Sequence, residues 1–138
     1  MNAFKIEGHT ADIRLQVSGS ELPQLFESAL AGMNEIMKKG FFEETNVPTK
    51  IERIQLSATD VTALLVDFLS EALTKSHTSR ILFNRVEFDE LTETSVQAKL
   101  HGVPVAKFER DIKAVTYHEA EIRKNDQGRY ETTIVFDI

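Results

Sequence analysis

Two stretches of the chain repeat apolar residues at the spacing of three and four that is typical of an amphipathic helix. The first predicted helix has its apolar stripe at Leu22, Leu25, Phe26, Ala29, Leu30, Met33, Ile36 and Met37. Ser20 is expected to cap this helix, and Pro23 is tolerated in its first turn because the missing N–H has no helical partner there. Residues 38–40, Lys-Lys-Gly, supply the signals for its end.

The second predicted helix follows a capping residue at Thr59 or Asp60. Its apolar positions are Val61, Leu64, Leu65, Phe68, Leu69, Ala72 and Leu73. We expect it to end around Lys75 and to be followed by a polar loop over residues 76–79. Both helices have one apolar face, which must be buried against another layer.

Other segments alternate apolar and polar residues with the period of two that predicts half-buried strands. They are residues 4–7, 12–18, 50–56, 81–89, 94–101, 112–123 and 128–138. In the third of them Ile51 is out of phase with Ile54 and Leu56, which suggests a β-bulge. A short acidic turn makes a hairpin of the fourth and fifth segments, and the turn-forming residues 124–128 make a hairpin of the last two.

These elements predict an α+β fold in a single domain, residues 1–138, with two amphipathic helices packed on a mostly antiparallel sheet of about six to seven strands. The chain has 138 residues, 41% of them hydrophobic and 28% charged, which is ordinary for a globular protein with a real core. It contains no cysteine, so disulfides and thiolate chemistry are excluded and a cytoplasmic location is expected.

The charge and the apolar segments narrow the set of binding partners. The formal net charge is −6 at pH 7, which disfavours strong direct binding to nucleic acid and favours cations. The longest apolar stretch, residues 61–73, is interrupted by Asp67, Ser70 and Glu71, so no membrane association is expected. No signal-peptide pattern opens the sequence.

Common enzyme signatures, including a glycine-rich phosphate loop, a serine nucleophile elbow and a zinc-binding helix, are absent from the sequence. The remaining candidates for chemistry are His9, Asp12, Lys113, Tyr117, His118, Asp137 and the terminal carboxylate of Ile138. Carboxylate oxygens favour a hard cation, which would be required if Asp12, Asp137 and the terminus converged. Spacing alone leaves the alternative open that Asp12 is a turn residue and Asp137 a solvated strand end.

Three motifs taken together resemble the archease family. They are Gly-His-Thr-Ala-Asp at 8–12, Ile-Lys-Ala-Val-Thr-Tyr-His at 112–118 and the terminal Val-Phe-Asp-Ile at 135–138. The resemblance extends over essentially the whole chain. Archeases are cytosolic proteins that assist the RNA-splicing ligase of tRNA splicing, promoting guanylylation of the ligase and its repeated turnover. The resemblance therefore implies a protein cofactor with no catalytic residues of its own, not an enzyme, and an RNA-splicing ligase as its partner.

The resemblance also implies a metal site formed by Asp12, Asp137 and the terminal carboxylate of Ile138. The expected cofactor is a divalent cation, Ca²⁺ or Mg²⁺, with Mn²⁺ as a further option. His9, Lys113 and His118 are motif neighbours whose roles the resemblance leaves open. Two other functions remain as alternatives: a metal-dependent phosphoester hydrolase, which needs a substrate pocket and a base, and a chaperone, which needs exposed apolar surface.

Overall fold

The computed structural model describes residues 3–8, 12–44 and 47–138. Its helices are α1 (Leu22–Met37) and α2 (Val61–Ser79), and a 3₁₀ turn, η1 (Phe41–Glu43), follows α1. The strands are β1 (Ala3–Gly8), β2 (Asp12–Gly19), β3 (Lys50–Ser57), β4 (Ile81–Leu91), β5 (Ser95–Pro104), β6 (Ala114–Thr116), β7 (Arg123–Lys124) and β8 (Tyr130–Asp137).

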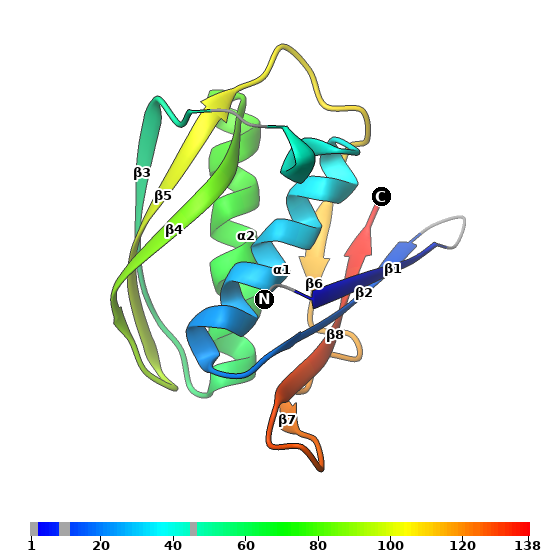
Figure 1. Ribbon diagram of the computed structural model, residues 1–138, viewed down its shortest axis with the longest axis vertical. Coiled ribbons are helices and arrows are strands. Elements are labelled where there is room, and N and C mark those ends of the chain that lie inside the picture. The colour runs from blue at the N-terminus through cyan, green and yellow to red at the C-terminus, as the bar shows by residue number, and fades with distance from the viewer. Residues whose placement is uncertain (1–2, 9–11, 45–46) are drawn as a thin grey trace.

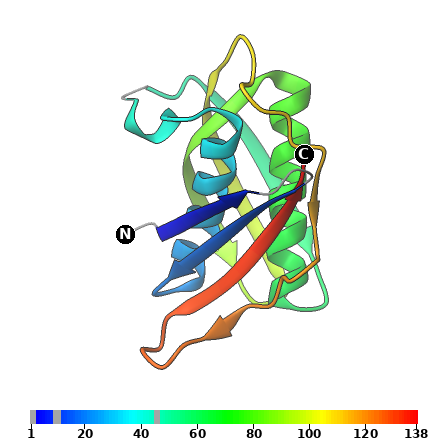
Figure 2. The same ribbon diagram turned by 90° about the vertical axis from the view of Figure 1, so that its right-hand side faces the viewer.

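The strands form two antiparallel sheets with both helices between them (Figure 1). The larger sheet, sheet A, has the order β1-β2-β8-β6, with β7 also paired to β8. The smaller one, sheet B, has the order β3-β5-β4. Figure 2 shows β1, β2 and β8 side by side in front of the helices, so that one face of sheet A packs on the helices and the other is open.

The core lies between the two sheets because each strand turns its apolar alternation toward the helices. On β2 and β8 the residues facing the helices are Ile13, Leu15, Val17, Thr132, Ile134 and Phe136, all buried. The rings of Phe26 on α1 and Phe68 on α2 lie 5.3 Å apart between their centroids. The packing of sheet B is close enough to require a glycine, because a Cβ at Gly102 would lie 2.8 Å from the carbonyl oxygen of Leu82.

The start of α1 differs from the prediction. Ser20 does not cap the helix: the N-cap is Glu21, which makes no side-chain capping bond. The amide oxygen of Gln24 instead accepts hydrogen bonds from the backbone N–H and the hydroxyl of Ser20, at 2.6 and 2.9 Å. The predicted end is confirmed, since Lys38 closes the helix and Gly40 has the left-handed φ of 82°.

The second helix is longer than predicted. Asp60 is its cap, with Oδ1 accepting from the N–H of Ala63 at 2.8 Å. The helix continues through the expected loop to Ser79 and ends at Arg80, whose φ is 55°. The loop prediction over residues 76–79 was wrong because no glycine or proline interrupts that stretch and Ser76 is buried on the core side.

The strand register also corrects two predictions. β3 pairs with β5 without interruption, so the bulge predicted at Ile51 is absent, and Ile51 simply points outward with 53% of its surface exposed. The register shifts lie in β4, between Phe83 and Arg85 and between Phe88 and Glu90. β5 continues beyond residue 101 to Pro104.

The last hairpin is only partly as predicted. Its turn is confirmed, with the N–H of Gly128 donating to the carbonyl of Asn125 at 2.9 Å and a φ of 75° at Gly128. The predicted strand 112–123 is broken into β6 and β7, and residues 117–122 leave the sheet between them. Two hydrogen bonds hold this detour: the N–H of Ile122 donates to Thr62 Oγ1 on α2 at 3.1 Å, and that of Glu121 to Thr132 Oγ1 on β8 at 3.0 Å.

The α+β prediction, with two helices on antiparallel strands, is confirmed, although the strands are divided between two sheets. Neither helix in the described residues combines the length and the apolar composition needed to span a membrane.

Candidate metal site at the end of sheet A

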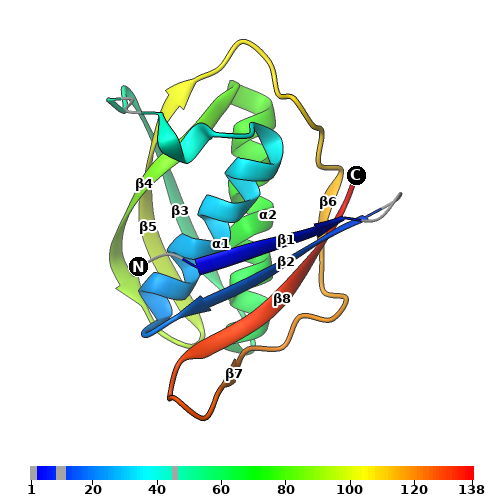
Figure 3. The ribbon, with the colours of Figure 1, turned by 45° about the vertical axis from the view of Figure 1, so that its right-hand side comes forward.

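Asp12 and Asp137 are brought together by the pairing of β2 with β8. The two residues are direct partners in the antiparallel register, Asp12 opening β2 and Asp137 closing β8. Their neighbours Ile13 and Phe136 are buried against the helices, so both aspartates belong to the open face of sheet A. Partners of this kind have Cβ atoms about 4.5–5.5 Å apart. The structure therefore forms an acidic pair, Asp12 and Asp137, where the start of β2 meets the end of β8. Figure 3 shows these two strands side by side in sheet A.

One carboxylate oxygen of the acidic pair has no hydrogen-bond donor among the described residues. Oδ1 of Asp12 is buried and has no hydrogen-bond partner in the part of the chain that is described. A buried acceptor without a partner costs about 1–3 kcal/mol, and two like charges directly opposite each other across a ladder destabilise it further. A cation between the carboxylates would remove both costs, so the residues present fit a hard metal ion.

The remaining predicted residues lie at different distances from the acidic pair. Ile138 directly follows Asp137 and is half-buried, with its side chain packed against the core. The backbone N–H of Lys113 donates to the carbonyl of Asp137 at 2.7 Å, which places the start of β6 beside this residue. The side chain of Lys113 is exposed. The structure thus brings Lys113 and Ile138 to the pair.

His118 is not brought to the acidic pair. The chain runs away from Asp137 along β6, and His118 lies beyond its end with 76% of its side chain exposed. Its Nε2 is 4.0 Å from Glu119 Oε2. His9 lies outside the described residues. Within the described residues no group of three or more histidine, cysteine, aspartate or glutamate side chains could hold a metal, so an ion would need backbone or terminal oxygens, or water, besides the pair.

Tyr117 is engaged elsewhere. Its hydroxyl donates a hydrogen bond to Asp67 Oδ1 on α2, which connects the detour of residues 117–122 to the helix layer. That bond, followed by partial burial and the charges of Asp67 and Asp60, raises the pKa of Tyr117 above its usual value. A tyrosine with a raised pKa stays protonated at neutral pH, so Tyr117 fixes the detour in place and offers no base.

Sequence reasoning missed an ion pair on the same face. Arg14 Nη2 lies 2.6 Å from Glu119 Oε1. The alternation along β2 already placed Arg14 beside Asp12, but nothing in the sequence pattern indicates a partner 105 residues away. This ion pair lies on the open face of sheet A. Along β2, Arg14 stands between Asp12 and Gln16.

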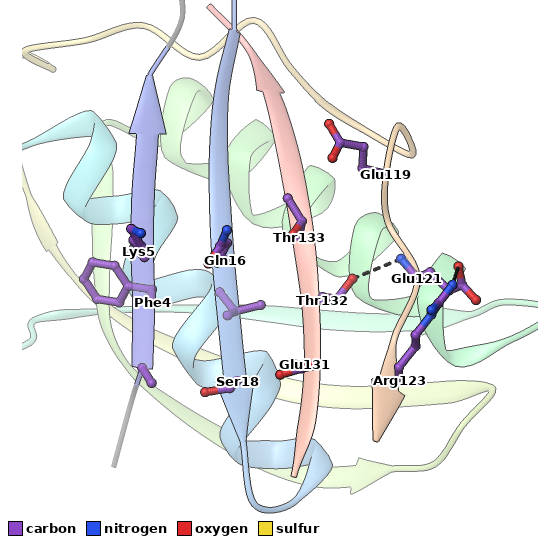
Figure 4. A pocket seen from close by; sticks show the side chains of 12 residues that line it. Phe4, Lys5, Gln16, Ser18, Glu119, Glu121, Arg123, Glu131, Thr132 and Thr133 are labelled. Carbon is purple, nitrogen blue, oxygen red and sulfur yellow. Dashed lines mark hydrogen bonds and ion pairs between the residues drawn. The ribbon is translucent and has the colours of Figure 1, made fainter. Parts of the chain in front are cut away.

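Beyond this ion pair the open face is hollowed, as Figure 4 shows from close by. The hollow has a volume of about 520 Å³ and is lined on β1 and β2 by Lys5, Gln16 and Ser18 among others. Its other wall includes Glu121 and Arg123, which are paired at 2.7 Å. The register separates this hollow from the acidic pair, so it is not part of the candidate metal site.

A second hollow adjoins the site through Lys113. It has a volume of about 750 Å³ and lies between the end of α2 and residues 107–113. Arg80 and Lys107 line it together with Lys113, and the rings of His77 and Phe108 lie with their centroids 5.7 Å apart and their planes tilted by 59°. Glu109 and Asp111 line the same hollow, so the surface beside the acidic pair carries charges of both signs.

Comparison with known proteins gives a consistent result. Residues 4–138 match the archease protein family. The chain is 33% identical to the archease of Methanosarcina acetivorans over 94% of its own length and 92% of the relative's. It is 32% identical to the archease of Sulfolobus acidocaldarius over the full length of both chains.

Two solved structures are similar to this one over nearly their whole length. Protein 1598 of Methanobacterium thermoautotrophicum has a TM-score of 0.76 and 26% identity, with 98% of each chain covered. The archease of Thermotoga maritima, described as a possible chaperone, has a TM-score of 0.63 and 25% identity, with 97% of this chain and 96% of that chain covered. The match of the family over residues 4–138 and these full-length relatives lead to one conclusion: this chain belongs to the archease family.

Proposed function

We propose that this protein is a coactivator of an RNA-splicing ligase and that it acts through a divalent cation held at the end of sheet A. The cation is bound by Asp12, Asp137 and the terminal carboxylate of Ile138. The observation that carries the proposal is the direct pairing of Asp12 with Asp137, with a buried Asp12 oxygen that has no partner in the described chain. Coactivation of a ligase is the function that the archease resemblance implies.

The donor set determines the class of ion. All three groups offer oxygen only, which suits Ca²⁺ at about 2.3–2.6 Å or Mg²⁺ at about 2.0–2.1 Å, and Mn²⁺ accepts the same ligands. When bound, the ion supplies positive charge that can stabilise phosphate oxygens during nucleotidyl transfer. The chain's own residues hold the ion: the β2–β8 ladder fixes both carboxylates, and the Lys113 N–H fixes the carbonyl of Asp137.

The position of the pair suits a protein that acts on a partner. Asp137 is exposed at the end of its strand, on the open face of sheet A, so a bound ion faces outward. The adjoining hollow carries the exposed cationic side chains of Lys113, Arg80 and Lys107, together with the carboxylates of Glu109 and Asp111. An outward-facing ion, with three cationic side chains in the adjoining hollow, fits a surface that docks at a phosphate-handling cleft of another protein.

The test is a joining assay with the cognate ligase. Substoichiometric protein should convert a single ligase turnover into repeated RNA joining, and the protein alone should join nothing. Asp137→Asn should abolish this stimulation. Glu131→Gln is the matched control, because Glu131 belongs to the same face of β8 and is exposed, but its register partners are Ser18 on β2 and Arg123 on β7. Unchanged ligase turnover at saturating wild-type protein would refute coactivation.

A chaperone function is the second candidate, because the Thermotoga maritima relative is described as a possible chaperone. Binding of unfolded clients needs a contiguous apolar patch. The large apolar side chains that are exposed in the described residues are Ile6, Val47, Ile51 and Tyr117, which lie on separate segments. Suppression of the aggregation of unrelated clients would favour this second function, and hydrolysis of generic phosphoesters by the isolated protein would instead indicate an enzyme.

A further inference from the structure

The two edge strands of sheet B, β3 and β4, differ in how well they are protected against pairing with another strand. β4 is interrupted by two register shifts, between Phe83 and Arg85 and between Phe88 and Glu90. Irregularities of this kind bend a strand and hinder pairing at its edge. β3 has eight residues, contains no proline and keeps an unbroken register with β5. In the described part of the chain β3 pairs with β5 alone, so its other edge is regular and open.

The backbone of β3 presents hydrogen-bonding groups along this open edge. In an antiparallel ladder, alternate residues direct both their N–H and their carbonyl to the same neighbouring strand. The N–H of Ala58 donates to the carbonyl of Thr94 at 2.9 Å, which continues the register of β3 with β5. In steps of two from Ala58, the even-numbered residues of β3 therefore bond to β5. The residues that direct both backbone groups away from β5 are Ile51, Arg53, Gln55 and Ser57.

The same odd-numbered residues have their side chains on the outer face of sheet B, which is turned away from the helices. Ile54 and its partner Ala98 are buried, so Arg53 and its register partner Lys99 lie on the outer face. Figure 1 shows both helices on one side of sheet B and open space on the other. Ile51 is 53% exposed on this face. Arg53 and Lys99 are like charges directly opposite each other, an arrangement that destabilises a ladder.

The carboxylates of the outer face leave the charge of this pair of cations incompletely balanced. Glu87 is the partner of Lys99 on β4, but its Oε1 already lies 2.8 Å from Arg85 Nη2 and 2.6 Å from His101 Nε2. Glu90 lies farther along β4 and accepts a hydrogen bond from the hydroxyl of Ser95 at 2.8 Å. Among the described residues no carboxylate forms an ion pair with Arg53. The outer face beside β3 is therefore positively charged.

The open edge and the charge together determine the kind of partner that fits. The edge offers donors and acceptors in alternation, which another polypeptide backbone matches. Phosphate groups only accept hydrogen bonds and would leave the outward carbonyls unpaired. A second copy of β3 would bring Arg53 but no carboxylate to the outer face, so it would add positive charge. An acidic segment of a different protein satisfies both the edge and the charge.

We propose that β3 docks an extended acidic segment of another protein, which joins sheet B as a fourth strand and places a carboxylate on the outer face beside Arg53. Residues two positions apart on the segment then lie next to Arg53 and Ile51, so the segment carries an acidic and an apolar residue at that spacing. Sheet B is separated from sheet A by the helices, so the docked segment leaves the acidic pair accessible. Docking at β3 requires no ion at Asp12 and Asp137.

The first experiment adds the end-capped peptide Thr-Val-Thr-Val-Glu-Lys-Val to the full chain and follows amide hydrogen exchange by NMR. In an antiparallel arrangement its glutamate lies opposite Arg53 and its last valine opposite Ile51. The peptide should slow exchange at the outward amides of Ile51, Arg53 and Gln55 by about tenfold or more. The amides of Glu52 and Ile54 bond to β5 and should be protected both with and without peptide.

The second experiment exchanges the charges. A peptide with lysine in place of glutamate should bind the wild type about tenfold more weakly, because a repulsion replaces an attraction. Arg53→Glu should reverse this preference, so that the lysine peptide binds more tightly. Arg85→Glu is the matched control. It makes the same change on the same face two strands away, at about 10 Å, and should keep the preference for glutamate.

The third experiment tests the backbone pairing. N-methylation of the second threonine removes an N–H directed at β3 and should weaken binding roughly tenfold. N-methylation of the following valine removes an N–H directed away from β3 and should leave affinity within about twofold. On the protein, Gln55→Pro removes an outward N–H, which edge strands tolerate, and should abolish docking while the melting temperature confirms the fold.

Four results would overturn the proposal. The first is an absence of added protection at about 1 mM peptide, and the second is an Arg53→Glu variant that still prefers glutamate. The third is self-association of the wild type in sedimentation that Gln55→Pro abolishes, because the edge then pairs with a second copy. The fourth is binding of a single-stranded oligoribonucleotide that Arg53→Gln weakens and Gln55→Pro leaves unchanged, because the face then binds phosphates. None of these results bears on calcium binding, so the proposed metal site stands or falls separately.

Discussion

Asp137→Asn should stabilise the metal-free protein and destabilise the calcium-loaded one relative to wild type. Two unit charges about 5 Å apart repel by about 1 kcal/mol in water and by about 3 kcal/mol at an effective dielectric constant of ~20. Asp137 is exposed and Asp12 half-buried, so the lower figure applies. Removing one charge should therefore raise the melting temperature in EDTA by about 3–5 °C.

With calcium, the wild type should have a higher melting temperature than Asp137→Asn. An ion at one hundred times its dissociation constant stabilises the wild type by about 2.7 kcal/mol, more than the repulsion costs, and Asp137→Asn loses most of that gain. Thermal unfolding of wild type and Asp137→Asn, each with EDTA and with calcium, shows whether calcium changes which protein melts at the higher temperature. For wild type and Glu131→Gln, calcium should not change which one melts higher. If Asp137→Asn lowers the melting temperature in EDTA, or if calcium leaves the wild type unchanged, the two carboxylates do not form an ion site.

Three further outcomes are expected. Two glycines added after Ile138 move the terminal carboxylate by up to about 7 Å, so calcium affinity by calorimetry and ligase stimulation should both fall while the fold is kept. Gly102→Ala should destabilise the protein by about 1–3 kcal/mol in urea unfolding, because its Cβ would lie 2.8 Å from the Leu82 carbonyl oxygen. The pKa of Glu87 is lowered, first by its hydrogen bond to His101, so the stability from this pair is present above pH 4.5 and lost as pH falls through the lowered value. His101→Gln should bring the Glu87 carboxyl titration, followed by NMR, back toward 4.5.

The sequence predicted those elements whose signals are local. The stripes of α1 and α2 and the alternation of Ile134 and Phe136 all depend on spacing within one segment, and each is confirmed. The boundaries were less accurate where a capping residue had a competitor. Ser20 resembles a cap, but Gln24 accepts its hydrogen bonds, and Ser76 carries no signal that distinguishes a loop from a buried helical turn.

What could not be predicted depends on partners far apart in sequence. The division of strands into two sheets follows from which strand pairs with which, and alternation is the same in either arrangement. Ile51 is an example. An isoleucine that points to solvent and an isoleucine at a β-bulge break the apolar alternation in the same way, so the sequence does not distinguish them. At the candidate site, the family motifs indicated Asp12 and Asp137, and the ion pair of Arg14 with Glu119 was found only in the structure.

The pairing of β2 with β8 also bears on how the protein folds. It joins the second strand of the chain to the last one, so forming it closes a loop that contains both helices and all of sheet B. Long-range closure of this kind is slow, because the chain loses much entropy before any contact compensates for it. The helices and the β4–β5 hairpin can form from local contacts first. A partly folded chain would then hold Asp12 and Asp137 far apart, so binding of the proposed cation would require the completed fold.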